Sequence, residues 1–310
     1  MIELILVFFI AFLPAIHPNN LLLLFKENLP LLVGFLIGLL PISTKLYQSE
    51  NINHIKYILS VLIGAGIAVL FGLMNIYYLY KPFKVYIWIL TILIFIFIIV
   101  KFDLRFVLSF IIFGIWGIIA LDEKYLYHIF VGIFSIPFLL FKKETSSQNN
   151  FSYKASILGG IIGSISLFFP AISSASFFAS ILPIYASYYT AIIGAQYVGS
   201  VIYYFETGLI RNGYVEAFKN WYDLFYMIIG IVLGSIISSK VEIPRVNLDK
   251  IKYISLIAVL ILGLYQSIEG FIIMIASACL VYFFKDYSSI SYLGVIIIPT
   301  IFLLLNLILK

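Results

Sequence analysis

The chain has 310 residues, of which 63% are hydrophobic and 11% are charged, and its net charge is +5. Soluble domains carry about 25% charged residues, so this composition excludes a water-soluble globular protein. The lysines and arginines stand singly between apolar runs, which indicates orientation in a membrane and not binding to nucleic acid. One cysteine, Cys279, excludes a disulfide framework, and the three scattered histidines do not have the spacing of metal ligands.

Apolar runs of bilayer-spanning length recur along the whole chain. About 20 apolar residues cross the hydrocarbon core as a helix, and lipid forces each backbone amide to be satisfied internally, so we expect helices and not a β-barrel. The expected segments are residues 2–25, 29–46, 56–80, 84–101, 105–121, 125–141, 155–182, 184–205, 221–239, 251–268, 270–284 and 289–309. The short 268–270 connection predicts a tight helical hairpin. The expected class is an all-α polytopic protein of the cell (cytoplasmic) membrane.

The chain divides into two similar halves, in which three sets of markers recur at a nearly constant separation. Pro14-Ala15-Ile16 recurs as Pro170-Ala171-Ile172, and Gly34 recurs as Gly194. In the third set, Tyr125, Gly132 and Pro137 recur as Tyr287, Gly294 and Pro299. We therefore predict a first transmembrane repeat at 1–141, a polar linker at 142–153 and a second transmembrane repeat at 154–310.

Each half opens with a segment that proline interrupts. Pro14 and Pro18 lie in the middle of segment 2–25, and Pro170 lies within segment 155–182. A proline inside a helix removes a hydrogen bond and clashes with the preceding turn, so each segment suits a re-entrant hairpin that enters and leaves on one side. About five transmembrane helices then follow in each half. Because five is odd, the second repeat is predicted to be inverted.

The distribution of lysine and arginine over the loops sets the orientation of this arrangement. It places the linker in the cytoplasm and both termini outside. Lysine and arginine stand at or near the ends of the expected spans and not in their interiors, so we expect no ladder of charges like that of a voltage sensor or a proton pump. Glu206 and Glu269 lie at the ends of expected spans, and we expect them to be solvated.

The two proline breaks form the candidate binding site. Residues before proline leave the helical region, so each break frees carbonyls and exposes amides at the start of the next half-helix. Helix N-termini favour anions, and freed carbonyls suit a coupling Na⁺. The alternative is a simple kink that neighbouring helices satisfy. The candidate substrate-binding residues are Pro14, His17, Pro18, Asn19, Asn20, Pro170, Ser173, Ser174, Ser176 and Gln196.

Two of these candidates have special chemistry. His17 is the only titratable residue in either break, and it is a candidate anion ligand or proton relay, or else a cap for a backbone carbonyl. Gln196 lies inside an apolar run, so it needs an internal partner and is a candidate for the cavity wall. No nucleotide-binding motif is present, and we expect neither an enzyme nor a resident cofactor.

Glycines within the expected spans predict faces where helices approach closely. They are Gly34, Gly38, Gly64, Gly66, Gly159, Gly160, Gly163, Gly194, Gly199, Gly230 and Gly234.

The two break motifs resemble a known family. Pro-Ala-Ile-His-Pro-Asn at 14–19 and Pro-Ala-Ile-Ser-Ser-Ala at 170–175 are similar to motifs of the TctA family, the large membrane subunits of tripartite tricarboxylate transporters, and of its archaeal branch in particular. The resemblance implies secondary transport of a carboxylate or another organic anion, driven by Na⁺ or H⁺, with substrate contacts at 14–20 and 170–176. It adds a small membrane subunit or a solute-binding protein as candidate partners, besides a homodimer. This chain has Ala15 and Ala171 where the family usually has glycine.

Three other interpretations of the twin breaks stay open. The second break is also similar to a motif of undecaprenyl-pyrophosphate phosphatase, but that enzyme needs arginine and acidic residues, and neither break contains them. A polyprenyl-phosphate carrier also uses twin proline hairpins. Its ligand would be a lipid phosphate, and it would need a lateral opening between helices. A structural or assembly role is the last alternative.

Overall fold

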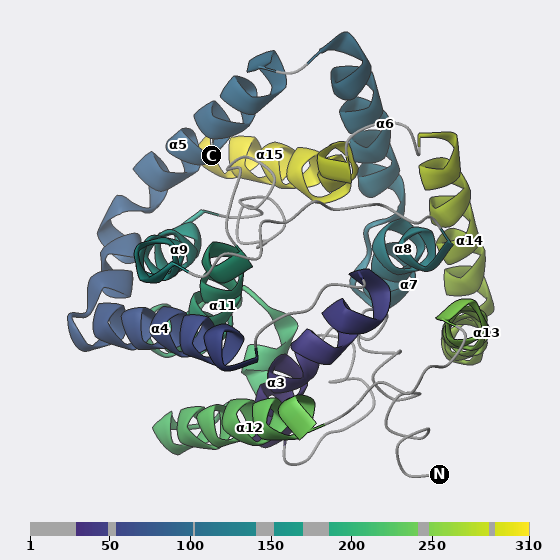
Figure 1. Cartoon of the computed structure of the whole chain (residues 1–310). Coiled ribbons are helices and arrows are strands. Elements are labelled where there is room, and N and C mark those ends of the chain that lie inside the picture. Colours follow the sequence, from purple (N-terminus) through teal and green to yellow (C-terminus); the bar gives the residue numbers. More distant parts are fainter. Residues whose placement is uncertain are drawn as a thin grey trace. The chain divides into compact units, whose positions relative to one another are not determined.

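The computed structural model describes residues 29–48, 54–101, 103–140, 152–169, 186–240, 248–284 and 289–309, and these ranges are helical with no strand (Figure 1). The longer helices are α3 (Leu29–Gln48), α4 (His54–Leu73), α5 (Tyr80–Lys101), α6 (Leu104–Ala120), α9 (Tyr153–Ser166), α11 (Ala186–Thr207), α12 (Trp221–Lys240), α13 (Leu248–Gln266), α14 (Ile268–Phe283) and α15 (Gly294–Ile308). The short elements are the 3-10 helices η1 (Ile76–Leu79), η2 (Glu123–Tyr125), η4 (Gly213–Ala217) and η5 (Ser289–Leu293), the π-helix η3 (Val131–Ser135), α7 (Leu126–Phe130) and α8 (Ile136–Leu140).

Four of the described helical stretches are long and apolar enough to cross a membrane. They are Ile55–Leu73, Ile76–Phe97, Trp221–Ser238 and Ser291–Ile308. Large apolar side chains are exposed along such helices; in α5, Phe97 is 68% exposed and Val100 is 77% exposed. So large an apolar surface suits lipid and not water. The protein is therefore embedded in a membrane, and the predicted all-α class is confirmed for the described residues.

Local signals explain two of the connections between helices, the one after α4 and the one between α13 and α14. The expected segment 56–80 is divided, because α4 ends at Leu73 and Asn75 adopts a positive φ of 53°. The short connection predicted at 268–270 is present, since Ser267 alone separates α13 from α14. Packing of these two helices as a tight hairpin stays a prediction. The hydroxyl of Ser267 accepts a hydrogen bond from the Gly270 amide at 3.1 Å and so caps α14.

The contacts divide the chain into two compact units, and each unit takes helices from both halves of the sequence. Unit 1 contains α3, α4, α9, α11, α12 and residues 248–257 of α13. Unit 2 contains α5, α6, α7, α8, α14, α15 and residues 258–266 of α13.

In unit 1, α3 and α12 pack with their backbones in contact. Four glycines make this approach possible: Gly34, Gly38, Gly230 and Gly234. A Cβ atom on Gly34 would lie 1.9 Å from the carbonyl oxygen of Met227, and one on Gly38 would lie 2.4 Å from that of Ile231. The second contact lies four residues further along α3 and also four residues further along α12 than the first, so the two helices run parallel. Small residues at a spacing of four are the usual means of close helix packing in membranes.

The second pair in unit 1, α4 and α11, repeats these contacts at equivalent positions. A Cβ atom on Gly64 would lie 1.9 Å from the carbonyl oxygen of Ala191, and one on Gly194 would lie 2.1 Å from that of Val61. Further along, a Cβ atom on Gly199 would lie 3.3 Å from Cβ of Ala68, so α4 and α11 are also parallel.

The equivalence of the two pairs holds residue by residue. Gly34 in α3 corresponds to Gly194 in α11, and Leu31 corresponds to Ala191, because both pairs are separated by the same number of residues. Likewise, Val61 in α4 corresponds to Met227 in α12, and Gly64 corresponds to Gly230, again at one common separation. Accordingly, a Cβ atom on Gly230 would lie 2.2 Å from the carbonyl oxygen of Leu31, as Gly64 faces Ala191.

The prediction that glycines within spans mark close approaches of helices is confirmed, with one exception. Each predicted glycine except Gly66 has a neighbouring atom within 3.0 Å of the position that a Cβ would take. Gly66 is exposed, and nothing lies within 4 Å of that position.

Helix α9 packs along the first half of α11 and then ends. The amide of Ser152 donates to Oγ of Ser187 at 3.2 Å, so the two helices begin side by side. A Cβ atom on Gly159 would lie 2.4 Å from the carbonyl oxygen of Tyr188, and α9 and α11 run parallel from there. Since α9 has 14 residues, it is about 21 Å long, which is shorter than a hydrocarbon core of about 30 Å.

Unit 2 pairs its helices in the same manner. A Cβ atom on Gly294 of α15 would lie 2.1 Å from the carbonyl oxygen of Phe110 in α6, and one on Gly132 of η3 would lie 2.3 Å from that of Met274 in α14. Gly132 and Gly294 are a pair of repeat markers. Their contact residues, Met274 and Phe110, are separated by nearly the same number of residues as the two glycines, so the two contacts are equivalent.

Both pairs in unit 2 are also parallel. Gly114 contacts Ile298 four residues beyond the contact of Phe110 with Gly294. Gly270 faces His128 four residues before the contact of Met274 with Gly132.

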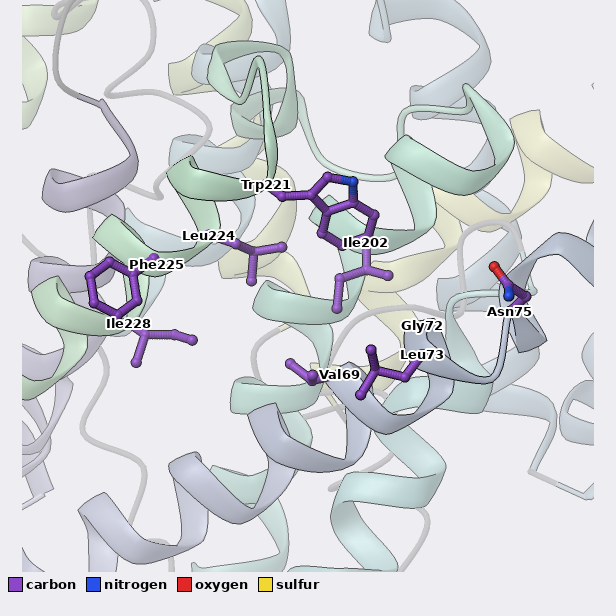
Figure 2. Close-up of a pocket in the computed structure, with 9 residues that line it drawn as sticks. All are labelled: Val69, Gly72, Leu73, Asn75, Ile202, Trp221, Leu224, Phe225 and Ile228. Carbon is purple, nitrogen blue, oxygen red and sulfur yellow. The ribbon is translucent and has the colours of Figure 1, made fainter.

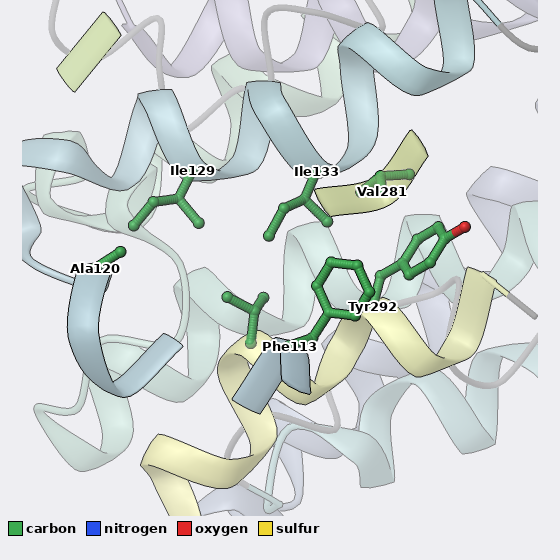
Figure 3. Close-up of a cluster of buried hydrophobic side chains, with 7 residues drawn as sticks. Phe113, Ala120, Ile129, Ile133, Val281 and Tyr292 are labelled. Atoms are coloured by element: carbon green, nitrogen blue, oxygen red, sulfur yellow. The ribbon is translucent and has the colours of Figure 1, made fainter. Parts of the chain in front are cut away.

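A cluster of buried side chains joins these helices in unit 2 (Figure 3). Its members are Phe113, Ala120, Ile129, Ile133, Val281, Tyr292 and Val295. The rings of Phe113 and Tyr292 lie 4.8 Å apart, and the Tyr292 hydroxyl donates to the carbonyl oxygen of Phe284 at 3.0 Å. Because lipid is as apolar as these side chains, the cluster stabilises the unit through van der Waals packing.

Candidate functional site at the end of helix α9

Most of the predicted substrate-binding residues lie outside the part of the chain that the structure describes. Those residues are Pro14, His17, Pro18, Asn19, Asn20, Pro170, Ser173, Ser174 and Ser176. Gln196 is described: it lies in α11, 6% exposed, and its Nε2 donates to Oγ of Ser166 at 2.9 Å. It therefore has an internal partner, and that partner is the last residue of α9.

A chain of hydrogen bonds extends from Gln196 in both directions. On one side, Oγ of Ser166 donates to the carbonyl oxygen of Gly163 at 2.7 Å. On the other side, Oγ of Ser200 donates to the carbonyl oxygen of Gln196 at 2.6 Å, and Nδ2 of Asn212 donates to Oγ of Ser200 at 2.7 Å. Ser166 and Ser200 are fully buried, so these bonds form where water does not compete.

The segment after α11 folds back along that helix. Gly208, with φ of +75°, ends α11 in the left-handed conformation that glycine adopts without strain, and its amide donates to the carbonyl oxygen of Tyr204 at 2.8 Å. The hydroxyl of Tyr214, in η4, donates to the carbonyl oxygen of Tyr197 at 2.8 Å, near the middle of α11. Tyr214 is fully buried, so protein surrounds this irregular stretch of backbone.

This return places Arg211 against the end of α9. Its Nε donates to the carbonyl oxygen of Leu167 at 2.9 Å, and one Nη donates to the hydroxyl of Tyr203 at 2.9 Å. Leu167 is the C-cap residue of α9, where the helix dipole favours a cation. Arg211 lies outside the expected spans, and it reaches α9 through a contact between residues far apart in sequence.

We call this cluster the α9-end site; its residues are Ser166, Leu167, Gln196, Ser200, Tyr203, Arg211 and Asn212. It brings a guanidinium, two amides and several hydroxyls together at the point where α9 stops beside the middle of α11. A guanidinium is the cation best suited to carboxylate and phosphate groups. Pro170, which opens the second predicted break, follows Leu167 by three residues.

Sequence inspection missed Arg211 and Asn212, although both stand in the sequence Glu206-Thr-Gly-Leu-Ile-Arg-Asn, directly after α11. The one available signal was Gly208, which predicts a reversal after the helix.

Unit 2 has polar groups of its own. His128 is 1% exposed, its Nε2 lies 3.0 Å from the carbonyl oxygen of Gly263, and the face of its ring covers Gly270. In the nearby loop, the Tyr125 hydroxyl donates to the Glu269 carboxylate, and a hydrogen bond to Tyr125 raises the pKa of Lys124. Among the described residues, no three histidines, cysteines or carboxylates gather as a metal site would require.

The expectation that Glu206 is solvated is wrong for one of its oxygens. Oε2 accepts a hydrogen bond from the Tyr78 amide at 3.0 Å, while Oε1 is buried and has no hydrogen-bond partner among the described residues. The cause is the parallel packing of α4 and α11, which end at the same level and bring the turn after α4 over the carboxylate.

The comparisons with known proteins leave the α9-end site as the main guide to function. No protein-family model, no curated protein and no solved structure matches this chain.

Proposed function

We propose that this protein is a secondary transporter of a carboxylate-type organic anion, coupled to Na⁺ or H⁺, and that it binds its substrate at the tips of two re-entrant hairpins. The observation that carries the proposal is the end of α9 halfway along α11, with Arg211 bound to the carbonyl oxygen of its C-cap residue, Leu167. A broken helix with polar groups at mid-membrane depth is typical of the substrate sites of transporters.

The parallel course of α9 and α11 supports the second re-entrant hairpin. Because α9 and α11 begin at the same level and run parallel, they fit the two ends of a segment that enters and leaves on one side. A helix that crossed the membrane before α11 would be antiparallel to it. We infer that residues 153–185 enter and leave on one side, with the motif 170–176 near the turn.

The parallel pairs also support inversion of the second repeat. Consecutive spans alternate in direction, and α3 and α4 are the first two spans of the first half, as α11 and α12 are of the second. Since α3 is parallel to α12, and α4 to α11, the first spans of the two halves point in opposite directions. Unit 2 gives the same result independently, from α6 with α15 and α14 with η3.

The charge of the α9-end site supports an anion as substrate. Arg211 is a fixed positive charge, and Gln196 and Asn212 add neutral hydrogen-bonding groups. In the proposed mechanism, the N–H groups of the half-helix that begins near Ser173 and Ser174 bind the carboxylate, and carbonyls freed by the prolines bind a coupling cation. Inversion puts the first break, Pro14 to Asn20, at the equivalent place on the opposite side.

Uptake into proteoliposomes tests this proposal. With the purified full chain, we expect labelled di- or tricarboxylates to accumulate under an inward Na⁺ or H⁺ gradient and not without one. Replacing Asn19, Asn20, Ser173 and Ser174 together by alanine is expected to lower uptake at least about 100-fold, since each removes a cap or a ligand.

A matched control replaces two asparagines and two serines outside the breaks by alanine: Asn51, Asn53, Ser146 and Ser147. This variant is expected to keep full uptake. Full uptake by the variant with the four break substitutions would refute the proposed site. Phosphate release from a prenyl pyrophosphate, or binding of a polyprenyl phosphate without carboxylate uptake, would favour the phosphatase or the carrier in its place.

A further inference from the structure

The carboxyl group of Glu206 has one oxygen at the surface of unit 1 and one in its interior. Oε2 accepts the Tyr78 amide at an exposed position, whereas Oε1 is buried. A Cβ atom on Gly72 would lie 3.4 Å from Oε1 and 2.5 Å from Cγ2 of Ile202, so the buried oxygen has apolar neighbours. Gly72 and Ile202 also line the pocket of Figure 2, and Glu206 does not, so Oε1 is enclosed beside that pocket.

These surroundings disfavour the charged form of Glu206. From α4 the uncharged Gly72 faces the carboxyl group, and from η1 the Tyr78 amide and the Tyr77 phenol face it. In the part of the chain that the structure describes, its contacts include no cation. Burying an unpaired charge costs far more than burying a neutral hydroxyl, so protonation stabilises such a group. A carboxyl group of this kind in a membrane protein is typical of a proton-binding site.

The phenol of Tyr77 connects this carboxyl group to the α9-end site. Tyr77 is fully buried and interacts electrostatically with Glu206. Its hydroxyl and Cδ1 of Leu167 lie 2.8 Å and 2.6 Å from the position that a Cβ on Gly199 would take. The hydroxyl therefore lies beside the C-cap residue of α9.

A second connection runs through Tyr203. The rings of Tyr77 and Tyr203 pack edge to face with their centroids 5.7 Å apart, and the guanidinium of Arg211 lies 4.9 Å from the centroid of the Tyr203 ring. Tyr203 precedes Glu206 by three residues in α11, so the two side chains are on the same face of the helix. One turn of helix and the Tyr203 ring therefore separate Glu206 from the positive charge of the α9-end site.

We infer that Glu206 takes up a proton from water when an anion binds at the α9-end site. This inference rests on the proposed function, because it requires an anion near Arg211. An ionised Glu206 would repel that anion through apolar surroundings that screen charge weakly, and the neutral acid would not. By linkage, protonation strengthens anion binding, and anion binding promotes protonation by the same factor. A proton would then travel with the anion.

Proton uptake on anion binding tests this inference with the purified full chain. A pH-indicator dye in weakly buffered detergent solution reports protons while succinate or citrate is added, whichever the native protein accumulates in proteoliposomes. We expect the native protein to take up protons, and its affinity to fall at least about fivefold as the pH rises from about 6 to about 9.

Two matched variants assign the proton. Glu206→Gln is neutral at every pH, so it is expected to take up no proton and to lose the fall in affinity. Its titration also corrects the native curve for ionisation of the anion itself. Glu216→Gln, which changes an exposed glutamate of the same unit, is expected to behave like the native protein.

Infrared spectroscopy keeps the test decisive if Glu206→Gln does not accumulate. The carbonyl band of a protonated carboxylic acid is expected to grow in the native protein when the anion binds, and Glu206→Asp, which keeps a carboxyl group, is expected to shift it. An unshifted band, or proton uptake by Glu206→Gln, would assign the proton to another group and overturn the inference. Accumulation of the anion without proton uptake or this band would overturn the inference and leave the proposed function intact. Failure of the native protein to accumulate either anion would refute the proposed function, and the inference with it.

Discussion

Replacing Arg211 by alanine is expected to abolish transport while the protein still reaches the membrane. The change leaves the carbonyl oxygen of Leu167 and the hydroxyl of Tyr203 without their guanidinium donors. A buried acceptor that loses its partner costs about 1–3 kcal/mol, and the dipole of α9 loses its counter-charge as well. The end of α9 would no longer be fixed by Arg211, and the proposed anion site would lose its fixed positive charge.

The matched substitutions separate position from charge. Arg211→Lys keeps the charge but cannot make both directed bonds, so we expect a lower maximal rate than that of the native protein. Arg105→Ala, an exposed arginine at the start of α6, is expected to leave uptake unchanged. Proteoliposome uptake at several substrate concentrations gives the rate and KM of each variant. Native kinetics for Arg211→Ala would show that this contact has no part in transport.

Replacing Gly64 by alanine is expected to prevent correct folding. The added methyl group would lie 1.9 Å from the backbone oxygen of Ala191, and a neighbouring backbone cannot rotate away as a flexible side chain can. Overpacking costs about 1–3 kcal/mol where side chains relax, so we expect at least about 3 kcal/mol here. The protein should lose most of its monodisperse fraction in detergent and unfold at a lower temperature.

Gly66 provides a control two residues away. An alanine there meets nothing within 4 Å, and helix propensity favours it by about 1 kcal/mol, so Gly66→Ala should be neutral or slightly stabilising. Thermal unfolding followed by size-exclusion chromatography compares both variants with the native protein. If Gly64→Ala and Gly66→Ala unfold alike, the close approach of α4 and α11 is wrong.

Local features of the sequence predicted local features of the fold. The length and apolarity of segments predicted helices, because each membrane span satisfies its own backbone. The glycines predicted where helices touch, since only glycine allows backbones so close. Repeat markers such as Gly34 with Gly194 now correspond to equivalent contacts in α3–α12 and α4–α11.

Long-range contacts were not predictable in this way. The contact of Arg211 with α9 was not predictable, because a charge count sees only neighbours in sequence and α9 is distant in sequence. Glu206 was expected in water for the same reason. The grouping of helices from both halves into each unit is likewise a property of three-dimensional packing, and no segment encodes it alone.

If the two halves are inverted around re-entrant hairpins, matching loops of the two halves lie on opposite sides of the membrane, and cysteine accessibility measures the side of each loop. Asp122 and Asp286 stand at matching places in the two halves, shortly before the repeat markers Tyr125 and Tyr287. With Cys279 replaced by alanine, single cysteines at these two positions are exposed to a membrane-impermeant maleimide in intact cells and in inverted vesicles. In the inverted arrangement the chain crosses the membrane an odd number of times between the two positions, so they lie on opposite sides. We therefore expect Asp122→Cys to react only in intact cells and Asp286→Cys to react only in inverted vesicles. Labelling of both positions from the same side would contradict the account.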